Sequence, residues 1–178
     1  MSKLTLLLAD ANILLDLIHL GREECLSLIV QKLGYTILIP SRIQNEVKNE
    51  ISSAQLVELG VTLLPVDLEV ELMLAAEHTC RTFSSEALSD SDVQLLIEAK
   101  RKLGILWTGD RCLRKSAKAY EVQTMYFFEP LLELAACHHL KRKTLLEMAK
   151  MLQSENDWGY PKDLVDQLAQ KLDERNIF

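Results

Sequence analysis

Short, nearly continuous apolar runs recur along the chain, separated by segments with helical spacing. A run of this kind is typical of a strand buried on both faces of a parallel sheet, because an exposed face would require alternating polar residues. The five runs cover residues 4–8, 35–39, 61–64, 105–108 and 123–127. Strands that alternate with helices predict an α/β fold. We therefore expect three α/β/α layers around a central parallel sheet of about five strands.

Helix boundaries are predicted from small and polar residues between the runs. Gly21 and Gly34 are expected to end two helices that follow the first strand. Ser41 is a suitable N-cap for the helix after the second strand, since its hydroxyl can accept a hydrogen bond from the first helical turn. Ser52 or Ser53 is expected to begin the next helix in the same way.

Ser89 and Asp92 have the spacing of a capping box, in which each side chain bonds the backbone N–H of the other residue. The helix that they begin is expected to end at Gly104. The segment before it, residues 82–87, is the most loop-like in the chain. We expect it to border a functional site, because functional loops lie at the ends of strands and helices.

The pattern from residue 131 onward is helical throughout. The expected elements are helices over 131–140, 144–152 and 162–172, with a turn at 156–161. No linker separates this part from the strands. We therefore expect residues 1–130 to form the α/β domain and residues 131–178 to form a C-terminal helical extension packed on the same domain.

The composition restricts the class of protein. With 178 residues, 48% of them hydrophobic, the chain can bury the core of one domain, and no apolar run reaches the roughly 18 residues of a membrane span. The four cysteines lack the paired spacing of zinc or redox sites, which favours a reduced cytoplasmic protein without a membrane partner. The net charge of -6 argues against strong, sequence-independent binding to nucleic acid, although lysines and arginines gather between residues 100 and 118.

Four acidic residues are expected at one edge of the sheet. They are Asp10, Glu46, Asp92 and Asp110. The carboxyl ends of parallel strands meet at this edge, where α/β proteins bind ligands. Carboxylates that converge there repel one another unless divalent cations offset their charge, and oxygen ligands favour Mg²⁺ or Mn²⁺ over zinc. Taken alone, Asp10 is also compatible with simple N-capping of the helix that follows it, and Glu46 with an ordinary surface position.

The segments that carry these acids are similar to a known family. They are Leu-Leu-Leu-Ala-Asp10-Ala-Asn12, Pro40-Ser-Arg-Ile-Gln-Asn-Glu46-Val, Leu88-Ser-Asp-Ser-Asp92-Val-Gln-Leu-Leu and Leu106-Trp-Thr108-Gly-Asp110-Arg. In this order they resemble the PIN-domain family, which includes the ribonuclease toxins of toxin–antitoxin pairs. The resemblance spans roughly residues 4–128, and the remaining part resembles the helical C-terminal hairpin of longer PIN proteins.

The resemblance implies an endoribonuclease that hydrolyses RNA phosphodiesters with Mg²⁺ or Mn²⁺. By position, Asp10, Asp92 and Asp110 would surround the metal, and Glu46 would complete the catalytic group. Asp90 is an alternative third acid, but Asp92 begins the apolar helix in the family-like register. In the two-metal form of this chemistry, one ion prepares the attacking water and the other stabilises the leaving oxygen.

Further roles follow from the same resemblance. Asn12 and Thr108 would orient two of the aspartates or their bound waters. Arg111, Arg114 and Lys115, on the helix after the last aspartate, are expected to bind phosphates that lead to the metal. The implied partners are RNA, a small antitoxin protein and a second copy of the chain, since PIN relatives are often dimers.

Two other functions stay open at this point. A PIN-like protein whose site no longer turns over would serve as a nucleic-acid-binding or assembly module. A phosphatase or phospho-acceptor domain of similar topology is disfavoured, because haloacid-dehalogenase-like phosphatases carry a second aspartate where this chain has Asn12. Asp16 is interpreted as an ordinary surface acid, and Tyr160 as part of a docked aromatic turn or an oligomer contact.

Overall fold

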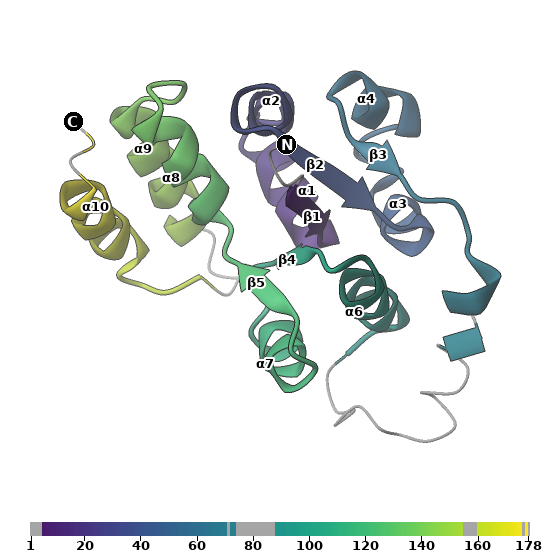
Figure 1. Cartoon of the computed structure of the whole chain (residues 1–178). Helices are drawn as coiled ribbons and strands as arrows, with labels where there is room; N and C mark the ends of the chain where they lie inside the picture. Colours follow the sequence, from purple (N-terminus) through teal and green to yellow (C-terminus); the bar gives the residue numbers. More distant parts are fainter. Residues whose placement is uncertain (1–4, 71, 74–87, 155–159, 176, 178) are drawn as a thin grey trace.

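The computed structural model describes residues 5–70, 72–73, 88–154, 160–175 and 177. Within these residues the chain has the expected α/β fold, with a five-stranded parallel sheet between helices (Figure 1). The loop expected at residues 82–87 and most of the turn expected at 156–161 lie outside the described residues.

All five predicted strands pair in parallel, in the order β3-β2-β1-β4-β5. They are β1 (Thr5–Ala9), β2 (Tyr35–Ile39), β3 (Thr62–Leu63), β4 (Ile105–Trp107) and β5 (Gln123–Met125). The last strand is shorter than predicted because Phe127 is already the N-cap of the next helix. Its apolar side chain is only 1% exposed, so Phe127 packs in the core although it does not belong to a strand.

The helices cover most of the remaining described residues. Before β4 they are α1 (Ala11–His19), α2 (Glu24–Leu28), its continuation η1 (Ile29–Leu33), α3 (Ser41–Val47), α4 (Ser53–Glu58) and α6 (Asp90–Lys102). After β4 they are α7 (Arg111–Ala119), α8 (Phe128–Ala136), α9 (Arg142–Ser154) and α10 (Leu164–Glu174). Residues 68–70 and 72–73 are also helical.

The order of the strands places a switch point between β1 and β4. Figure 1 shows α6 and α7 on one side of the sheet and α2, α8 and α9 on the other. The chain leaves β1 toward β2 and leaves β4 toward β5, so the connections of these two neighbouring strands run to opposite edges. In open α/β sheets, a crevice for ligands opens beyond the carboxyl ends of two such strands.

The start of α3 corrects one predicted boundary. Pro40, not Ser41, is the N-cap, and Ser41 is the first helical residue. The hydrogen-bond partner comes from α6, because the side-chain Oε1 of Gln94 accepts the backbone N–H of Arg42 at 3.2 Å. The hydroxyl of Ser41 instead lies 3.5 Å from the Gln94 amide nitrogen, which donates to it. Gln94, from a distant helix, therefore accepts a backbone N–H of the first turn of α3, the role that the sequence predicted for Ser41.

The end of α6 depends on Gly104 for a different reason from the one predicted. The left-handed residue at the end of the helix is Leu103, with a φ of 52°. Gly104 is required by space, since a Cβ at this position would lie 2.4 Å from a methyl carbon of Leu8 and 3.3 Å from the carbonyl oxygen of Leu6. The glycine thus allows β4 to begin directly against β1.

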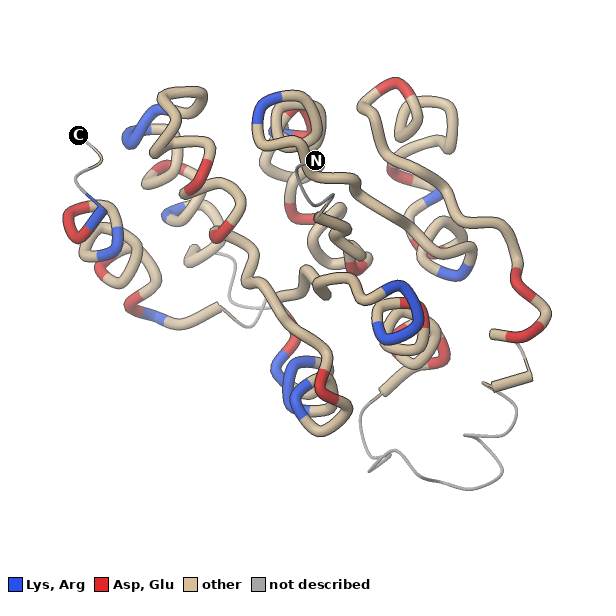
Figure 2. The backbone as a smooth tube through the Cα atoms, in the orientation of Figure 1, with Lys and Arg blue, Asp and Glu red and all other residues tan. Residues whose placement is uncertain are grey.

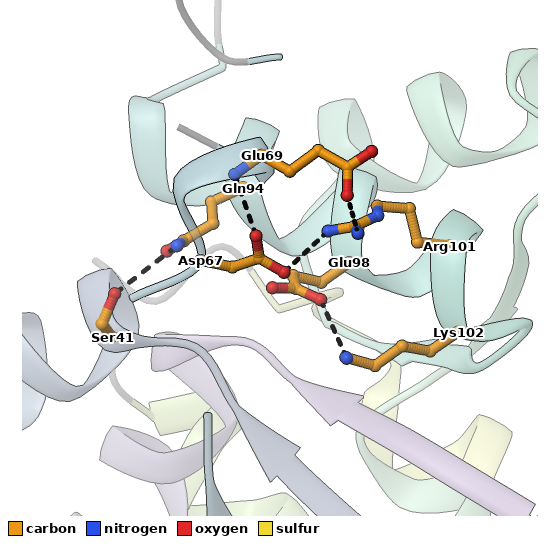
Figure 3. Close-up of polar contacts among 7 residues, drawn as sticks. All are labelled: Ser41, Asp67, Glu69, Gln94, Glu98, Arg101 and Lys102. Carbon is orange, nitrogen blue, oxygen red and sulfur yellow. Dashed lines mark hydrogen bonds and ion pairs between the residues drawn. The ribbon is translucent and has the colours of Figure 1, made fainter. Parts of the chain in front are cut away.

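Charged side chains hold the last two turns of α6 against the segment after β3 (Figure 3). Arg101 pairs with Asp67 at 2.9 Å and with Glu69 at 2.6 Å. One turn away, Lys102 lies 3.4 Å from Glu98, a carboxylate that is only 2% exposed. The two pairs of Arg101 link this end of α6 to the segment after β3, whereas the pair of Lys102 and Glu98 lies within the helix.

The three C-terminal helices share the core of the sheet. α8 packs on η1, α9 on α8, and α10 on α9. Leu131, Leu145 and Leu172, one from each helix, are fully buried in the same apolar cluster as the strands. The extension is therefore packed on the α/β layers as an additional layer.

Membrane spans and the state of the cysteines can be compared with the structure only within the described residues. Within the described residues, no helix combines the length and apolar character needed to cross a bilayer. Cys25, Cys112 and Cys137 are free thiols. Cys80 lies outside the described residues.

Candidate active site

Asp10 lies at the switch point, directly after β1. Its backbone N–H donates to the carbonyl oxygen of Trp107 at 3.0 Å, so the residue is held against the end of β4. Its side chain is only 3% exposed. The hydroxyl of Thr108 donates to Oδ2 of Asp10 at 2.7 Å and accepts the backbone N–H of Asp110 at 3.0 Å. Thr108 therefore joins the ends of the two strands, the supporting position predicted for it.

Burial makes the ionised form of Asp10 costly. Loss of solvent is the largest effect and raises the pKa of Asp10 from 3.8 to about 6. The negative charges of Asp92 and Asp110 contribute to this rise in pKa. Hydrogen bonds from Thr108 and from the backbone of Ala11 oppose the rise without cancelling it. Near pH 6 this carboxyl therefore exchanges a proton where an exposed aspartate would already be ionised.

Asp92 reaches the site from the first turn of α6. The predicted capping box is confirmed, with Oδ2 of Asp92 accepting the backbone N–H of Ser89 at 2.8 Å and its hydroxyl at 2.9 Å. Partial burial raises the pKa of Asp92, and the charge of Asp110 raises it further, while the two bonds from Ser89 lower it. Asp92 thus begins the helix and also contributes negative charge to the site.

Asp110 is the N-cap of α7, and its Oδ1 accepts the backbone N–H of Leu113 at 2.5 Å. Its charge acts on both Asp10 and Asp92, and that of Asp92 acts on Asp10. Three aspartates from segments up to a hundred residues apart therefore lie within electrostatic range of one another. The structure brings these three predicted residues together.

The remaining predicted acids lie differently. Glu46 is exposed on α3, and among the described residues no contact is recorded between it and the three aspartates. Asp90, the alternative to Asp92, lies 3.8 Å from Arg42 and is likewise absent from the charges that act on Asp10. The geometry favours Asp92 over Asp90, and a catalytic role for Glu46 stays a prediction.

A cleft of about 910 Å³ opens beside Asp110. Residues of α1, of α7 and of the turn before α7 line it, among them Asn12, Asp16, Gly109, Asp110, Arg111 and Arg114. The start of α8 and α10 also line it. A second, shallower hollow of about 520 Å³ lies along α7 and β5, and Arg111 and Arg114 line both. Figure 2 shows the concentration of lysines and arginines on α7.

The three predicted cations of α7 differ in how firmly they are held. Arg111 and Lys115 are exposed. Arg114 is half-buried: its Nε donates to the carbonyl oxygen of Asp110 at 3.2 Å, and its guanidinium lies 3.7 Å from the centre of the Tyr126 ring. Loss of solvent lowers the pKa of Arg114, although the charge of Asp110 favours the cation. Arg114 is thus a positioned cation at the boundary of the acidic group.

The structure also reveals a pair that the sequence reasoning missed. Asp16 is half-buried and not an ordinary surface acid, and its carboxylate accepts a hydrogen bond from the hydroxyl of Tyr160. Burial raises the pKa of Asp16 to about 6, while the bond from Tyr160 and the charge of His19 lower it. Burial and the Asp16 charge raise the pKa of Tyr160, and Asp10 adds to the rise. Docking of Tyr160 was among the alternatives, but no local pattern links two residues that lie 144 positions apart.

The aspartates suit a hydrated cation better than a closed metal cage. Among the described residues, no group of three or more histidine, cysteine, aspartate or glutamate side chains has the arrangement of a metal centre. The hydrogen bonds given above engage Oδ2 of Asp92 and Oδ1 of Asp110, one oxygen of each. Mg²⁺ usually keeps several waters and binds through one or two carboxylates. The donor set is therefore compatible with a hydrated Mg²⁺ or Mn²⁺ ion.

Comparisons with known proteins add no family assignment. The sequence matches no protein-family model and no curated protein sequence. The resemblance to PIN domains therefore stays an expectation from the four sequence segments.

Proposed function

We propose that the protein is an endoribonuclease that depends on Mg²⁺ or Mn²⁺. The observation that carries the proposal is the convergence of Asp10, Asp92 and Asp110 at the switch point of the sheet, beside a cleft lined by Arg111 and Arg114. An acidic group that contains one buried and two half-buried aspartates, next to cations that can bind phosphate, suits the cleavage of a phosphodiester. The similarity to PIN domains supports the same reaction.

Each residue has a distinct role in this proposal. Asp10, Asp92 and Asp110 would hold the metal, and Thr108 would keep Asp10 in place through the bond to Oδ2. When bound, the ion would lower the pKa of a water molecule and stabilise the extra negative charge of the transition state. A cation replaces the proton of Asp10, so we expect metal affinity and cleavage to decrease as the pH falls below about 6.

The cations of α7 would position the substrate. Arg111 and Lys115 are exposed and can reach phosphates in solution. Arg114 is held by Asp110 and Tyr126 and would bind the phosphate nearest to the acidic group. Because a chain of negative net charge binds nucleic acid through few such contacts, we expect weak or selective binding to RNA. An inhibitory antitoxin partner and a homodimer are further proposals that follow from the family resemblance.

Cleavage of short RNA tests the proposal directly. Purified wild type would be incubated with single-stranded and structured RNA in the presence of Mn²⁺, Mg²⁺ or a chelator. We expect metal-dependent cleavage that is lost in Asp10→Asn and Asp110→Asn. The matched control is Asp173→Asn, which removes a surface carboxylate paired with Arg142 at 2.7 Å, and it should retain full activity. Cleavage that survives in Asp10→Asn would show a contaminating nuclease and contradict the proposal.

One observation favours a second function. The described residues contain no ready-made metal centre, and the capping box engages Asp92. A protein with this arrangement could bind RNA at the basic cleft without hydrolysing it. If wild type binds RNA but no RNA is cleaved with either metal, the protein is a binding module and the nuclease assignment is wrong.

A further inference from the structure

The shallow hollow along α7 and β5 has an excess of positive charge. Its lining contains four cationic side chains, those of Arg111, Arg114, Lys115 and Lys118. Among the described residues that line it, Glu121 carries the only carboxylate, and this carboxylate already lies 3.5 Å from the ammonium of Lys100. The hollow is therefore strongly positive, although the chain as a whole has a net charge of -6.

The four cations form one stripe along α7. Their positions are i, i+3, i+4 and i+7, which share one face of an α-helix. At about 1.5 Å per residue, the stripe extends roughly 10 Å along the helix axis. The opposite face carries Leu113 and Ala117, which are fully buried. Packing therefore fixes the helix with its stripe turned toward solvent.

Most of this charge is not neutralised within the described part of the chain. No ion pair is recorded there for Arg111, Lys115 or Lys118, and all three side chains are exposed. Loss of solvent is the main effect that lowers the pKa of Arg114, and the charge of Arg111 lowers it too, while Asp110 opposes both. An anion bound between the cations would relieve this repulsion.

We propose that the backbone of a single RNA strand lies in this hollow, with its phosphates at Arg111, Lys115 and Lys118. The inference rests on the proposed function and extends it, because it gives the strand a path beyond the cleft and adds Lys118 to the binding surface. Arg111 and Arg114 line both the hollow and the cleft that contains Asp110. A strand in the hollow therefore leads to the acidic group without a break.

The lining favours RNA over an acidic segment of a protein. Protein partners usually anchor through apolar or aromatic side chains that enter well-packed pockets. Val122 is the only apolar residue among the described residues of the lining, and it is 7% exposed. The backbone of RNA needs no such anchor, since its affinity comes mainly from charge.

Two polar side chains of β5 complete the lining. Gln123 and Thr124 are exposed, and β5 is the last strand of the sheet, so no further strand covers them. Amide and hydroxyl groups bond phosphate and ribose in nucleic-acid complexes, and such contacts do not distinguish one base from another. We therefore expect the hollow to bind RNA weakly and without selecting its sequence.

Binding of RNA in the absence of cleavage tests the inference. A short fluorescent single-stranded RNA would be titrated with the full chain in a chelator, at several salt concentrations, and followed by anisotropy. Lys118→Gln should weaken binding by about threefold to tenfold and should reduce the slope of log K against log salt by about 0.7, the contribution of one phosphate contact to a single strand. A purely structural effect of the substitution would not change this slope.

Lys150→Gln is the matched control. Lys150 is exposed on α9, lies outside both the hollow and the cleft, and belongs to a helix on the other side of the sheet (Figure 1). The substitution removes the same charge and should leave both the affinity and the slope as in wild type. The inference is overturned if Lys118→Gln behaves like Lys150→Gln.

Competition with an acidic polypeptide tests the choice of RNA. Poly-glutamate and an unlabelled RNA of the same total charge would each be used to displace the fluorescent RNA. We expect the RNA to displace it at a much lower concentration. Equal displacement by poly-glutamate would show a surface for acidic proteins and would overturn the inference.

The outcomes separate this inference from the proposed function. RNA binding that depends on Lys118, in a protein that cleaves no RNA, would support the path along α7 and contradict the nuclease. Metal-dependent cleavage by a protein in which Lys118→Gln changes neither the affinity nor the salt dependence would support the nuclease and contradict the path.

Discussion

At the scale of single residues, the molecule keeps a costly carboxylate at the end of its central strand. Asp10 is almost fully buried among other negative charges, and among the described residues no lysine or arginine forms an ion pair with it. Thr108 offers one hydrogen bond, which only partly offsets the loss of solvent. A residue that lowers stability in this way is expected where the protein binds a cation.

Replacement of Asp10 should therefore stabilise the protein at neutral pH. The folded carboxyl has a pKa of about 6 against 3.8 in the unfolded chain, so the folded state keeps a proton that the unfolded state releases between these values. Stability of wild type consequently falls as the pH rises from about 4 to above 6. Asp10→Asn does not lose stability in this way. We expect its free energy of unfolding to exceed that of wild type by up to about 3 kcal/mol at pH 7.5 and by little at pH 4. Urea unfolding at both pH values measures the difference; an equal gain at both would contradict the electrostatic origin.

A divalent cation should offset the loss of stability that the ionised carboxylate of Asp10 causes. If the aspartates hold the ion as proposed, Mn²⁺ would stabilise the folded state by about 2.7 kcal/mol at a concentration one hundred times the dissociation constant. We expect the melting temperature of wild type to rise with Mn²⁺ at pH 7.5 and much less at pH 5, where Asp10 holds its proton. Thermal scans of wild type and Asp10→Asn test this, and a similar rise in the variant would place the cation elsewhere.

The hydrogen bond between Tyr160 and Asp16 has its own pH signature. Tyr160→Phe removes the donor and leaves a largely buried carboxylate without it, which should cost about 1–3 kcal/mol at pH 7.5. Burial raises the pKa of Asp16 to about 6, so at pH 5 the carboxyl holds a proton and the cost should be smaller. Urea unfolding at the two pH values distinguishes this from a loss of packing, which would not depend on pH.

At the scale of elements, α6 combines a structural cap with the site. Asp92 closes the capping box with Ser89, and Arg101 pairs with Asp67 and Glu69 at the other end of the helix. The cap therefore determines where one of the three aspartates lies. α4 also begins with a capping box, formed by Ser52 and Gln55, but it carries none of the three aspartates.

This duplication supplies a matched pair of variants. Ser89→Ala and Ser52→Ala each remove a capping hydroxyl, and each should cost about 1 kcal/mol in unfolding free energy. Ser89→Ala also removes the hydroxyl, one of the two hydrogen-bond donors of Ser89 that lower the pKa of Asp92, so we expect Mn²⁺ binding to change in this variant alone. Calorimetric titration with Mn²⁺ measures it; equal binding in both variants would show that the cap does not position the metal ligand.

At the scale of the whole molecule, the C-terminal helices belong to the same cooperative structure as the sheet. Their buried leucines join the cluster that contains the strands, and α10 lines the cleft beside the aspartates. Loss of packing in α10 should consequently destabilise the entire chain. The boundary that the sequence suggested near residue 130 separates two parts of one core.

Leu172→Ala tests this directly. The side chain is fully buried and lies outside the lining of the cleft, so its truncation should cost about 2–5 kcal/mol. Hydrogen exchange of the backbone amides of β1 and α10 should accelerate together, because one transition unfolds both. Faster exchange confined to α10 would show that the extension unfolds independently.

Local patterns in the sequence were sufficient for the strands and for most helix starts. Apolar runs predicted the five strands because burial on both faces of a sheet leaves no room for polar alternation. The capping box at Ser89 and the start of α4 at Ser52 or Ser53 could be predicted because the bonds of a helix cap span only about three residues. The positions of Asp10 and Asp110 followed from the strands that precede them, since parallel strands end at one edge.

Interactions between distant residues were decided only by the tertiary structure. Gln94 replaces Ser41 at the start of α3, and Tyr160 bonds the half-buried Asp16, because packing of whole helices brings these residues together. The exposure of Glu46 is equally a result of how α3 lies on its neighbours. The sequence by itself determined which residues form the elements, since those forces act over a few positions. Only the tertiary structure decided which side chains are removed from solvent and which distant side chains contact one another. The chemistry of the cleft depends on these contacts.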